Sequence, residues 1–225
     1  MSREAIDEIY AHRFDDADAA AKDAIWQEIT RYLQRFVPHD AAVLDIACDR
    51  GDFIRNIGAR EKWASDMRNV RPLLPNEITF VQANGLDLAD HVPERHFDVV
   101  FMSNYLEHLP ASGDVIVQLR VAHRLLKPNG KVIVLQPNIR FVGARYWDFI
   151  DHSVALTERS LVEAAELAGF RTDTLIKRFL PYTTKSRLPK SPRLVRAYLS
   201  APLLWHILGK QTLFVGRSVS TRSNT

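Results

Sequence analysis

The chain has 225 residues, a formal net charge of +3 and one cysteine, Cys48. A single cysteine excludes an internal disulfide and a cysteine-rich metal site, and we expect no metal site of any other kind. The chain begins without the apolar run of a secretory leader, and no stretch is apolar over the length of a membrane span, so we expect a cytoplasmic protein. This length allows one α/β domain with room for an insertion.

The charge is distributed unevenly along the chain. Ten Lys and Arg residues follow Asp173, and no Asp or Glu occurs after that position. The preceding part is therefore net acidic. Such polarity indicates that the C-terminal part faces an anionic partner, such as phosphate, nucleic acid or a lipid surface.

The first predicted element is an amphipathic helix over residues 16–36, in which apolar residues recur at three- and four-residue spacing. Pro38 ends it. We treat residues 1–38 as an N-terminal helical segment and residues 39–225 as the main domain. The helix either packs on the edge of a sheet or lies over a ligand, and core packing is the simpler role for its residues.

From Val43 onward the sequence alternates between strand and helix patterns, which predicts a parallel sheet with helices on both faces. Predicted strands cover 41–46, 62–65, 78–82, 97–102, 131–136, 171–180 and 211–219, and predicted helices cover 114–126 and 158–168. Thr157 is placed to cap the second helix, which Gly169 closes. Residues 127–130 form a turn, and residues 218–225 form a tail.

The first strand leads into a turn at Gly51 and then into a short amphipathic helix. A strand, turn and helix in this order build a nucleotide site, because the N–H groups of the turn and of the helix start face one pocket. Asp66 ends the second strand, 21 positions after Asp45. In nucleotide-binding folds an acidic residue at this distance binds a ribose hydroxyl.

Four segments, in this order, resemble the motifs of class I S-adenosylmethionine (SAM)-dependent methyltransferases of the type 11 kind. Residues 43–53 resemble motif I, with Asp45 and Gly51 kept and with Ala47 and Asp49 in place of its first two glycines. Residues 82–86 resemble the adenine-binding segment, with Asn84 at its acidic position. Residues 97–109 resemble the fourth-strand motif with its Glu-His pair, and residues 125–130 resemble the Leu-Lys-Pro-Gly-Gly turn.

The resemblance implies a Rossmann-like, doubly wound, seven-stranded sheet that is mostly parallel, with an antiparallel last strand. It also implies that SAM is the methyl donor and S-adenosylhomocysteine (SAH) the product. The residues that it places at the cofactor are Asp45, Ala47, Asp49 and Gly51 around the methionine moiety, Asp66 and Met67 at the ribose, Asn84, Gly85 and Leu86 near adenine, and Ser103 and Asn104 at the end of the fourth strand.

Asp49 is the largest departure from the motif. Aspartate tolerates a left-handed backbone better than most residues do, but its carboxylate would lie close to that of SAM. Two such charges repel in a partly dry pocket. An alternative hypothesis is therefore a non-catalytic SAM-fold binding module that docks to a membrane or a protein partner.

The Gly-x-Gly-x-x-Gly pattern of a dinucleotide dehydrogenase is absent. Residues 103–106, Ser-Asn-Tyr-Leu, lack the Asn/Asp-Pro-Pro-aromatic motif of methyltransferases that act on base amino groups. The first absence argues against a dehydrogenase, and the second favours O-methylation over N-methylation of adenine or cytosine. His108 and His152 follow the fourth and fifth strands and are the candidate bases, because imidazole titrates near neutral pH. Either could instead be a structural or pocket-lining histidine. Tyr146, Trp147 and Phe149 could form the floor of a substrate pocket or a hydrophobic lid.

Residues 181–210 form an insertion between the last two strands. It starts with a basic, turn-rich stretch and continues as an apolar helix that Pro202 breaks and that contains Trp205. This pattern is typical of an element that lies on a membrane surface, and it suits a small-molecule or lipid-linked acceptor. A cap helix packed on the protein's own core, or on a dimer partner, is an equal alternative. A nucleic-acid surface is the least favoured of these interpretations, because the basic residues flank a strongly apolar segment.

Overall fold

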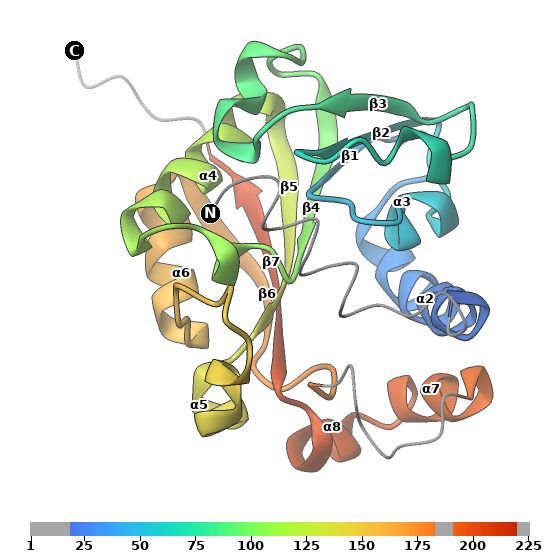
Figure 1. Ribbon diagram of the computed structural model, residues 1–225, viewed down its shortest axis with the longest axis vertical. Coiled ribbons are helices and arrows are strands. Elements are labelled where there is room, and N and C mark those ends of the chain that lie inside the picture. Colours follow the sequence, from blue (N-terminus) through green and yellow to red (C-terminus); the bar gives the residue numbers. More distant parts are fainter. Residues whose placement is uncertain (1–18, 183–190, 220–225) are drawn as a thin grey trace.

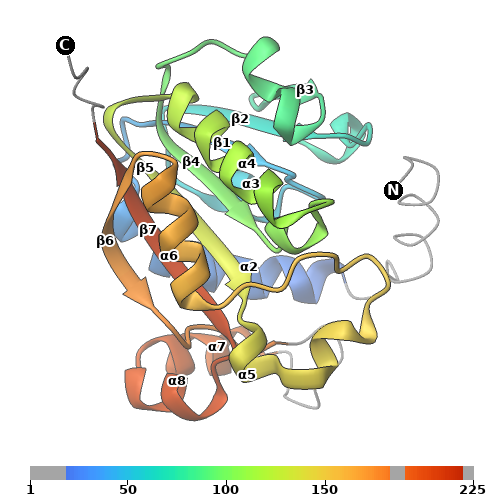
Figure 2. The same ribbon diagram turned by 90° about the vertical axis from the view of Figure 1, so that its left-hand side faces the viewer.

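The computed structural model describes residues 19–182 and 191–219, and its core is a seven-stranded sheet (Figures 1 and 2). The strand order is β3-β2-β1-β4-β5-β7-β6. Strand β7 runs antiparallel to both β5 and β6, and the other neighbouring strands are parallel. The predicted fold is therefore confirmed. The strands are β1 Ala42–Ile46, β2 Glu61–Asp66, β3 Thr79–Gln82, β4 Phe97–Ser103, β5 Leu126–Pro137, β6 Phe170–Ile176 and β7 Gln211–Ser218.

Helices cover both faces of the sheet (Figure 1). One face carries α2 Ala19–Leu33, α3 Asp52–Asn56, α7 Pro192–Leu199 and α8 Pro202–Leu208, and the other carries α4 Ser112–Leu125 and α6 Glu158–Leu167. Side chains alternate along the central strands. In β1, Leu44 and Ile46 face the α4 side and Val43 faces the α2 side. This alternation produces two apolar cores, one on each face.

Short segments complete the fold. They are α5 Ile139–Val142 and the 3-10 turns η2 Gln34–Phe36, η3 Arg71–Leu73, η4 Gly85–Asp90, η5 Leu106–His108 and η6 Gly143–Asp148. The predicted helix over 16–36 is observed as α2 followed by η2, and residues 16–18 lie outside the described residues. Thr157 caps α6 as predicted, because its side chain accepts a hydrogen bond from the Ser160 N–H.

Two predicted boundaries were wrong. The predicted turn over 127–130 lies inside β5, where it bulges out of the ladder: Leu126 pairs with Phe97, Lys131 pairs with Val99, and Asn129 between them has a left-handed φ of 64°. The predicted strand over 171–180 ends at Ile176. Beyond it the chain leaves the sheet, and the Phe179 side chain is buried in the core beneath α7 and α8.

The insertion forms α7 and α8, which are separated at Pro202 as predicted. Their inner face packs on the protein itself: the Trp205 ring lies 5.7 Å from that of Tyr32 in α2 and 5.2 Å from that of Phe179. The inner face of α7 and α8 is therefore a cap on the protein's own core, which was one of the alternatives for the insertion. Among the described residues, no helix is both long and apolar enough to cross a membrane.

Candidate functional site

The carboxyl ends of β1, β2, β3 and β4 meet at one edge of the sheet. The strand order reverses direction between β1 and β4, and open α/β sheets bind ligands at such a point. Backbone hydrogen bonds join the loops there: the Cys48 N–H donates to Ser65 O at 2.9 Å, and the Ala83 N–H donates to Asp66 O at 3.1 Å. The structure thus brings together the residues that the sequence predicted around the cofactor.

The loop after β1 has an alternating left-handed backbone. The φ angles of Ala47, Asp49 and Gly51 are 57°, 50° and 74°. Only Gly51 is a glycine, so Ala47 and Asp49 adopt a conformation that costs most residues energy. Ala47 and Asp49 replace two glycines of the motif, and both positions have positive φ angles that favour glycine. The turn then leads directly into α3.

The Asp49 carboxylate is paired with two cations. Arg68 Nη2 lies 2.8 Å from Asp49 Oδ1, and Lys22 Nζ of α2 lies 3.3 Å from Asp49 Oδ2. Lys22 also pairs with Asp52, in the first turn of α3, at 3.0 Å. These contacts compensate the negative charge of a residue predicted to lie beside the cofactor. The repulsion that motivated a non-catalytic module is thereby reduced.

Asp66 is buried and hydrogen-bonded through both carboxylate oxygens. Its Oδ2 accepts from the Asp49 N–H at 3.0 Å, and its Oδ1 accepts from the Arg68 N–H at 2.9 Å and from Arg68 Nε at 3.2 Å. Burial alone would lower the pKa of Arg68, but the carboxylates of Asp66 and Asp49 outweigh it and raise that pKa. The ion pair fixes the orientation of the carboxylate predicted to bind the ribose.

Asp45 lies within β1, beneath the loop, and is buried. Burial raises the pKa of this carboxyl well above its ordinary value, and the nearby carboxylates of Asp52, Asp66 and Asp49 raise it further. Asp45 therefore lies where it can support the loop from below.

The adenine segment begins at Asn84, an exposed residue that caps η4 by accepting a hydrogen bond from the Leu86 N–H at 3.1 Å. Its amide oxygen retains a second lone pair for a further donor. At Gly85 a Cβ would overlap Tyr105 Oη, which donates to Gln118 Oε1 at 2.8 Å. Glycine is thus required there by close packing.

The remaining predicted cofactor residues border the same edge. Met67, Leu86 and Ser103 are half-buried, and Asn104 is exposed with a left-handed φ of 48°. The Asn104 N–H donates to Leu135 O at 2.9 Å, and its side-chain amide donates to Ser103 Oγ at 3.1 Å.

The two candidate bases are neighbours. The rings of His108 and His152 lie 5.1 Å apart between centroids. His108 Nδ1 lies 3.1 Å from Asp151 O and 3.3 Å from Asp151 Oδ2. The N–H groups of Ser153 and Val154 donate to Glu107 O, which fixes the loop of His152 against η5. Two histidines 44 positions apart thus form one cluster with Glu107.

The aromatic residues after β5 take different positions. Tyr146 is buried, and its hydroxyl donates to Val154 O, so it supports the loop from within the core. Phe149 stacks on His152 at 5.1 Å, and Trp147 is exposed. Tyr146 also borders the histidine cluster, because its ring lies 4.7 Å from that of His152.

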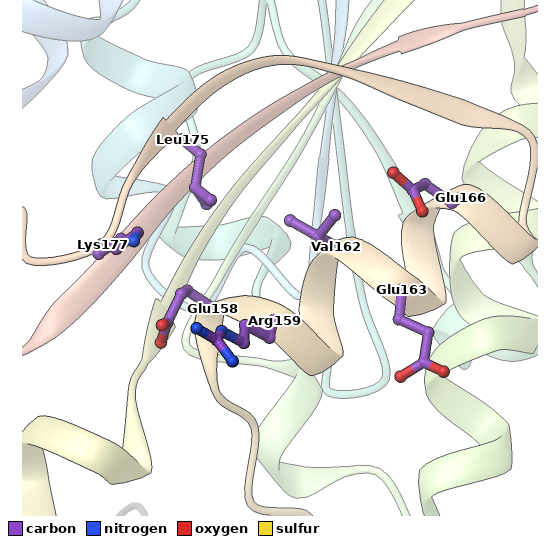
Figure 3. A pocket seen from close by; sticks show the side chains of 7 residues that line it. All are labelled: Glu158, Arg159, Val162, Glu163, Glu166, Leu175 and Lys177. Carbon is purple, nitrogen blue, oxygen red and sulfur yellow. The ribbon is translucent and has the colours of Figure 1, made fainter.

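A groove of about 290 Å³ lies elsewhere, between α6 and β6. Figure 3 shows it beside Val162 and Leu175, with charged side chains along α6. None of the residues predicted at the cofactor lines it, so it is separate from the site at the carboxyl edge.

Sequence reasoning missed four charged residues of this region: Lys22, Arg68, Glu107 and Asp151. Glu107 and Asp151 each precede a candidate histidine directly, and Arg68 follows Asp66 by two positions. Adjacency in the sequence was the available signal for these three residues. No local pattern relates Lys22 to Asp49.

Comparison with known proteins supports this description. Residues 17–175 match the family described as "Methyltransferase domain". No curated protein matches the sequence.

Solved structures share the fold at low identity. A complex of the Haloferax volcanii Trm112 methyltransferase activator with a methyltransferase matches with a TM-score of 0.69 and 17% identity, over 94% of this chain and 98% of that chain. A SAM-dependent methyltransferase from Archaeoglobus fulgidus matches with a TM-score of 0.61 and 16% identity, over 84% and 93%. Geranyl diphosphate C-methyltransferase from Streptomyces coelicolor A3(2), in complex with Mg²⁺, geranyl diphosphate and SAH, matches with a TM-score of 0.60 and 14% identity, over 85% and 78%.

Proposed function

The chain belongs to the methyltransferase domain family and is a SAM-dependent methyltransferase, and we propose that it methylates a hydroxyl oxygen of a small-molecule, sugar or lipid-linked acceptor. When bound, SAM supplies a methyl group on a positively charged sulfur. The residues of the chain then need only align the acceptor oxygen and remove its proton.

The loop after β1 and Asp66 would hold the cofactor. The left-handed backbone at Ala47, Asp49 and Gly51 and the start of α3 offer N–H groups at the methionine end. Asp66 would accept from the ribose hydroxyls, and Asn84 would accept from the adenine amino group. The electrostatic fit rests on Lys22 and Arg68, which offset the carboxylates around the loop.

The observation that carries the choice of oxygen is the cluster of His108 and His152 beside Asp151. A hydroxyl acceptor must lose a proton, and imidazole is the side chain whose ordinary pKa lies near neutral pH. The contact between His108 Nδ1 and Asp151 leaves Nε2 directed toward the remainder of the cluster. We assign the activation of the acceptor hydroxyl to this cluster.

Titration calorimetry with SAM and with SAH is the first test. We expect micromolar binding of both, in competition with each other. Asp66→Asn should weaken SAM binding at least about tenfold, because a charged acceptor of hydrogen bonds is lost, whereas Asp90→Asn, at an exposed position of η4, should not change it. No binding to the parent protein would favour the non-catalytic alternative, and unchanged binding to Asp66→Asn would refute the ribose assignment.

Transfer of a radiolabelled methyl group to a panel of sugars, phenols and lipid-linked sugars then tests the acceptor. His108→Asn and His152→Asn should abolish transfer while SAM binding persists. Product analysis that locates the methyl group on nitrogen or carbon would refute O-methylation.

A lipid-linked acceptor is supported by the outer face of α8. Leu203 and Ile207 are 82% and 69% exposed, and the exposed Arg193 lies nearby in sequence on α7. The Asn138 N–H donates to Lys210 O, which places the end of the insertion beside the start of α5, next to the carboxyl edge of the sheet. An apolar face with basic residues around it can contact an anionic lipid surface. Lys185, Arg187 and Lys190 lie outside the described residues.

Flotation with vesicles of phosphatidylcholine and phosphatidylglycerol tests this contact. The double variant Leu203→Asp/Ile207→Asp should lose co-flotation. The control Leu167→Asp, at an exposed apolar position on α6, should retain it. Equal flotation of both variants, or no flotation of the parent, would refute the membrane contact and leave methyl transfer untouched.

A further inference from the structure

We propose that Glu107, His108 and His152 bind a divalent cation, a site that departs from the metal-free protein expected from the sequence. One ligand atom from each residue lies within 4.8 Å of the other two. Bonds of about 2.0–2.2 Å to zinc-type cations place neighbouring ligands up to about 4 Å apart. Small side-chain rotations would therefore close the three atoms around one ion.

The orientation of His108 supports this role. Its Nδ1 faces Asp151, at 3.1 Å from the backbone oxygen and 3.3 Å from Oδ2. Its Nε2 faces the Glu107 carboxylate, at 4.0 Å from Oε1. A histidine that ligates a metal commonly donates its other N–H to a carboxylate or carbonyl, which fixes the ring. Asp151 is placed to act in this way as a positioning residue.

The burial of Glu107 is a second, independent observation. Its side chain is 1% exposed, and Oε2 accepts no hydrogen bond from any residue within the described ranges 19–182 and 191–219. A buried carboxylate oxygen without a donor is costly. A cation held by both carboxylate oxygens, of which Oε1 lies 4.0 Å from His108 Nε2, would satisfy Oε2.

The donor set indicates which ions fit. Two imidazole nitrogens with one carboxylate oxygen suit first-row divalent ions such as Mn²⁺, Fe²⁺ or Zn²⁺ better than Mg²⁺ or Ca²⁺, which prefer oxygen ligands. Three protein ligands leave at least one coordination position open. An acceptor hydroxyl bound there would lose its proton more easily, because a bound cation lowers the pKa of an oxygen ligand.

This last step rests on the proposed methyl transfer and refines it. The two imidazoles would hold the cation, and the proton of the acceptor hydroxyl would pass to solvent water instead of to an imidazole. Binding of the cation itself requires neither SAM nor an acceptor, so the two proposals can fail separately.

The test uses the full chain without a polyhistidine tag, stripped with a chelator and dialysed. Binding is measured directly by calorimetric titration with Mn²⁺, Zn²⁺ and Mg²⁺. For Mn²⁺ it is also measured by the loss of the electron paramagnetic resonance signal of the free ion. We expect one Mn²⁺ or Zn²⁺ per chain and clearly weaker binding of Mg²⁺. Loss of a residue that hydrogen-bonds to a metal ligand typically weakens metal binding by roughly 10- to 100-fold, and Asp151→Asn should weaken Mn²⁺ binding within that range. His152→Asn removes a ligand itself and should weaken Mn²⁺ binding by more.

His206→Asn is the matched control, because His206 is an exposed histidine on α8. Its Mn²⁺ affinity should equal that of the parent. Glu107→Gln keeps the shape of the buried side chain and should also weaken Mn²⁺ binding. If Glu107→Gln fails to fold, His152→Asn still tests the site, because His152 is only half-buried. No stoichiometric binding to the parent, or equal binding by parent and His152→Asn, would overturn the proposal. SAM binding measured on the same stripped protein reports on the cofactor site alone.

Discussion

The loop after β1 allows the energetic cost of its backbone to be separated from the cost of its packing. At Gly51 the φ angle is +74°, and an added Cβ would overlap Leu74 Cδ2. At Gly143 the φ angle is +67° with a ψ of −149°, and nothing lies within 4 Å of an added Cβ. At Gly113, in α4, neither obstacle exists. Gly143 thus has a backbone obstacle alone, whereas Gly51 has both a backbone obstacle and a packing obstacle.

The expected free energies of unfolding follow from these differences. Gly113→Ala should stabilise the protein by about 0.5–1 kcal/mol, as alanine does in helices. Gly143→Ala should destabilise it by about 1–3 kcal/mol, because its φ of 67° and ψ of −149° lie in a region that residues with a side chain rarely adopt. Gly51→Ala should cost about 2–4 kcal/mol, because overpacking against Leu74 adds about 1–3 kcal/mol.

Urea unfolding measures the three free energies, and thermal unfolding gives an independent check. For a domain of this size, about 2–4 °C per kcal/mol is expected, so Gly51→Ala should lower the melting temperature by roughly 4–16 °C. Combining it with Leu74→Ala should recover the overpacking part and retain the backbone part. An equal loss on introducing Gly51→Ala into the parent and into Leu74→Ala would refute the contribution of Leu74.

Two further predictions concern charged groups. Asp49→Asn keeps a residue that tolerates a left-handed backbone and frees Lys22 and Arg68 of one carboxylate, so calorimetry at low salt should show SAM binding about fivefold tighter. Weaker binding would mean that Asp49 meets the ammonium group of the ligand or that its contact with Arg68 is needed to position Asp66. Hydrogen bonds from Arg196 and Arg31, together with their charges, lower the pKa of Glu28 from 4.5 to about 2, against the effect of burial. The stability that these contacts contribute is therefore present above pH 4.5 and lost as the pH falls toward 2. Urea unfolding of Glu28→Gln should lack that part of the pH dependence, and an unchanged profile would contradict the assignment.

Local patterns in the sequence were sufficient for most of the fold. The alternation of apolar strands and amphipathic helices gave the element order, and Thr157 and Pro202 marked a helix start and a helix break that the structure confirms. Strand ends were predicted less well. The Lys-Pro-Asn-Gly stretch has the composition of a turn, but Asn129 adopts a left-handed φ within β5. Strand β5 extends across this stretch because Leu126 and Lys131, on either side of it, both pair with β4.

Contacts between distant segments could not be predicted in this way. Arg196 and Glu28 are 168 positions apart, and their two hydrogen bonds, of 2.9 and 2.7 Å, join α7 to α2. The clustering of His108 with His152 depends on how the loop after α5 returns to η5. Such contacts arise from the tertiary fold, and a single sequence contains no periodic signal for them.

Asp49 shows how a departure from a family motif can be accommodated by residues outside that motif. The position requires a left-handed backbone, which aspartate tolerates, and its carboxylate requires a cation. One cation, Lys22, comes from α2, and the other, Arg68, comes from the loop after β2, where it also orients Asp66. Because Arg68 is shared between the two carboxylates, the replaced glycine and the predicted ribose ligand are energetically coupled. The substitution at Asp49 is therefore part of how this site positions Asp66, and restoring glycine at that position alone would also remove one of the contacts that hold Arg68 in place.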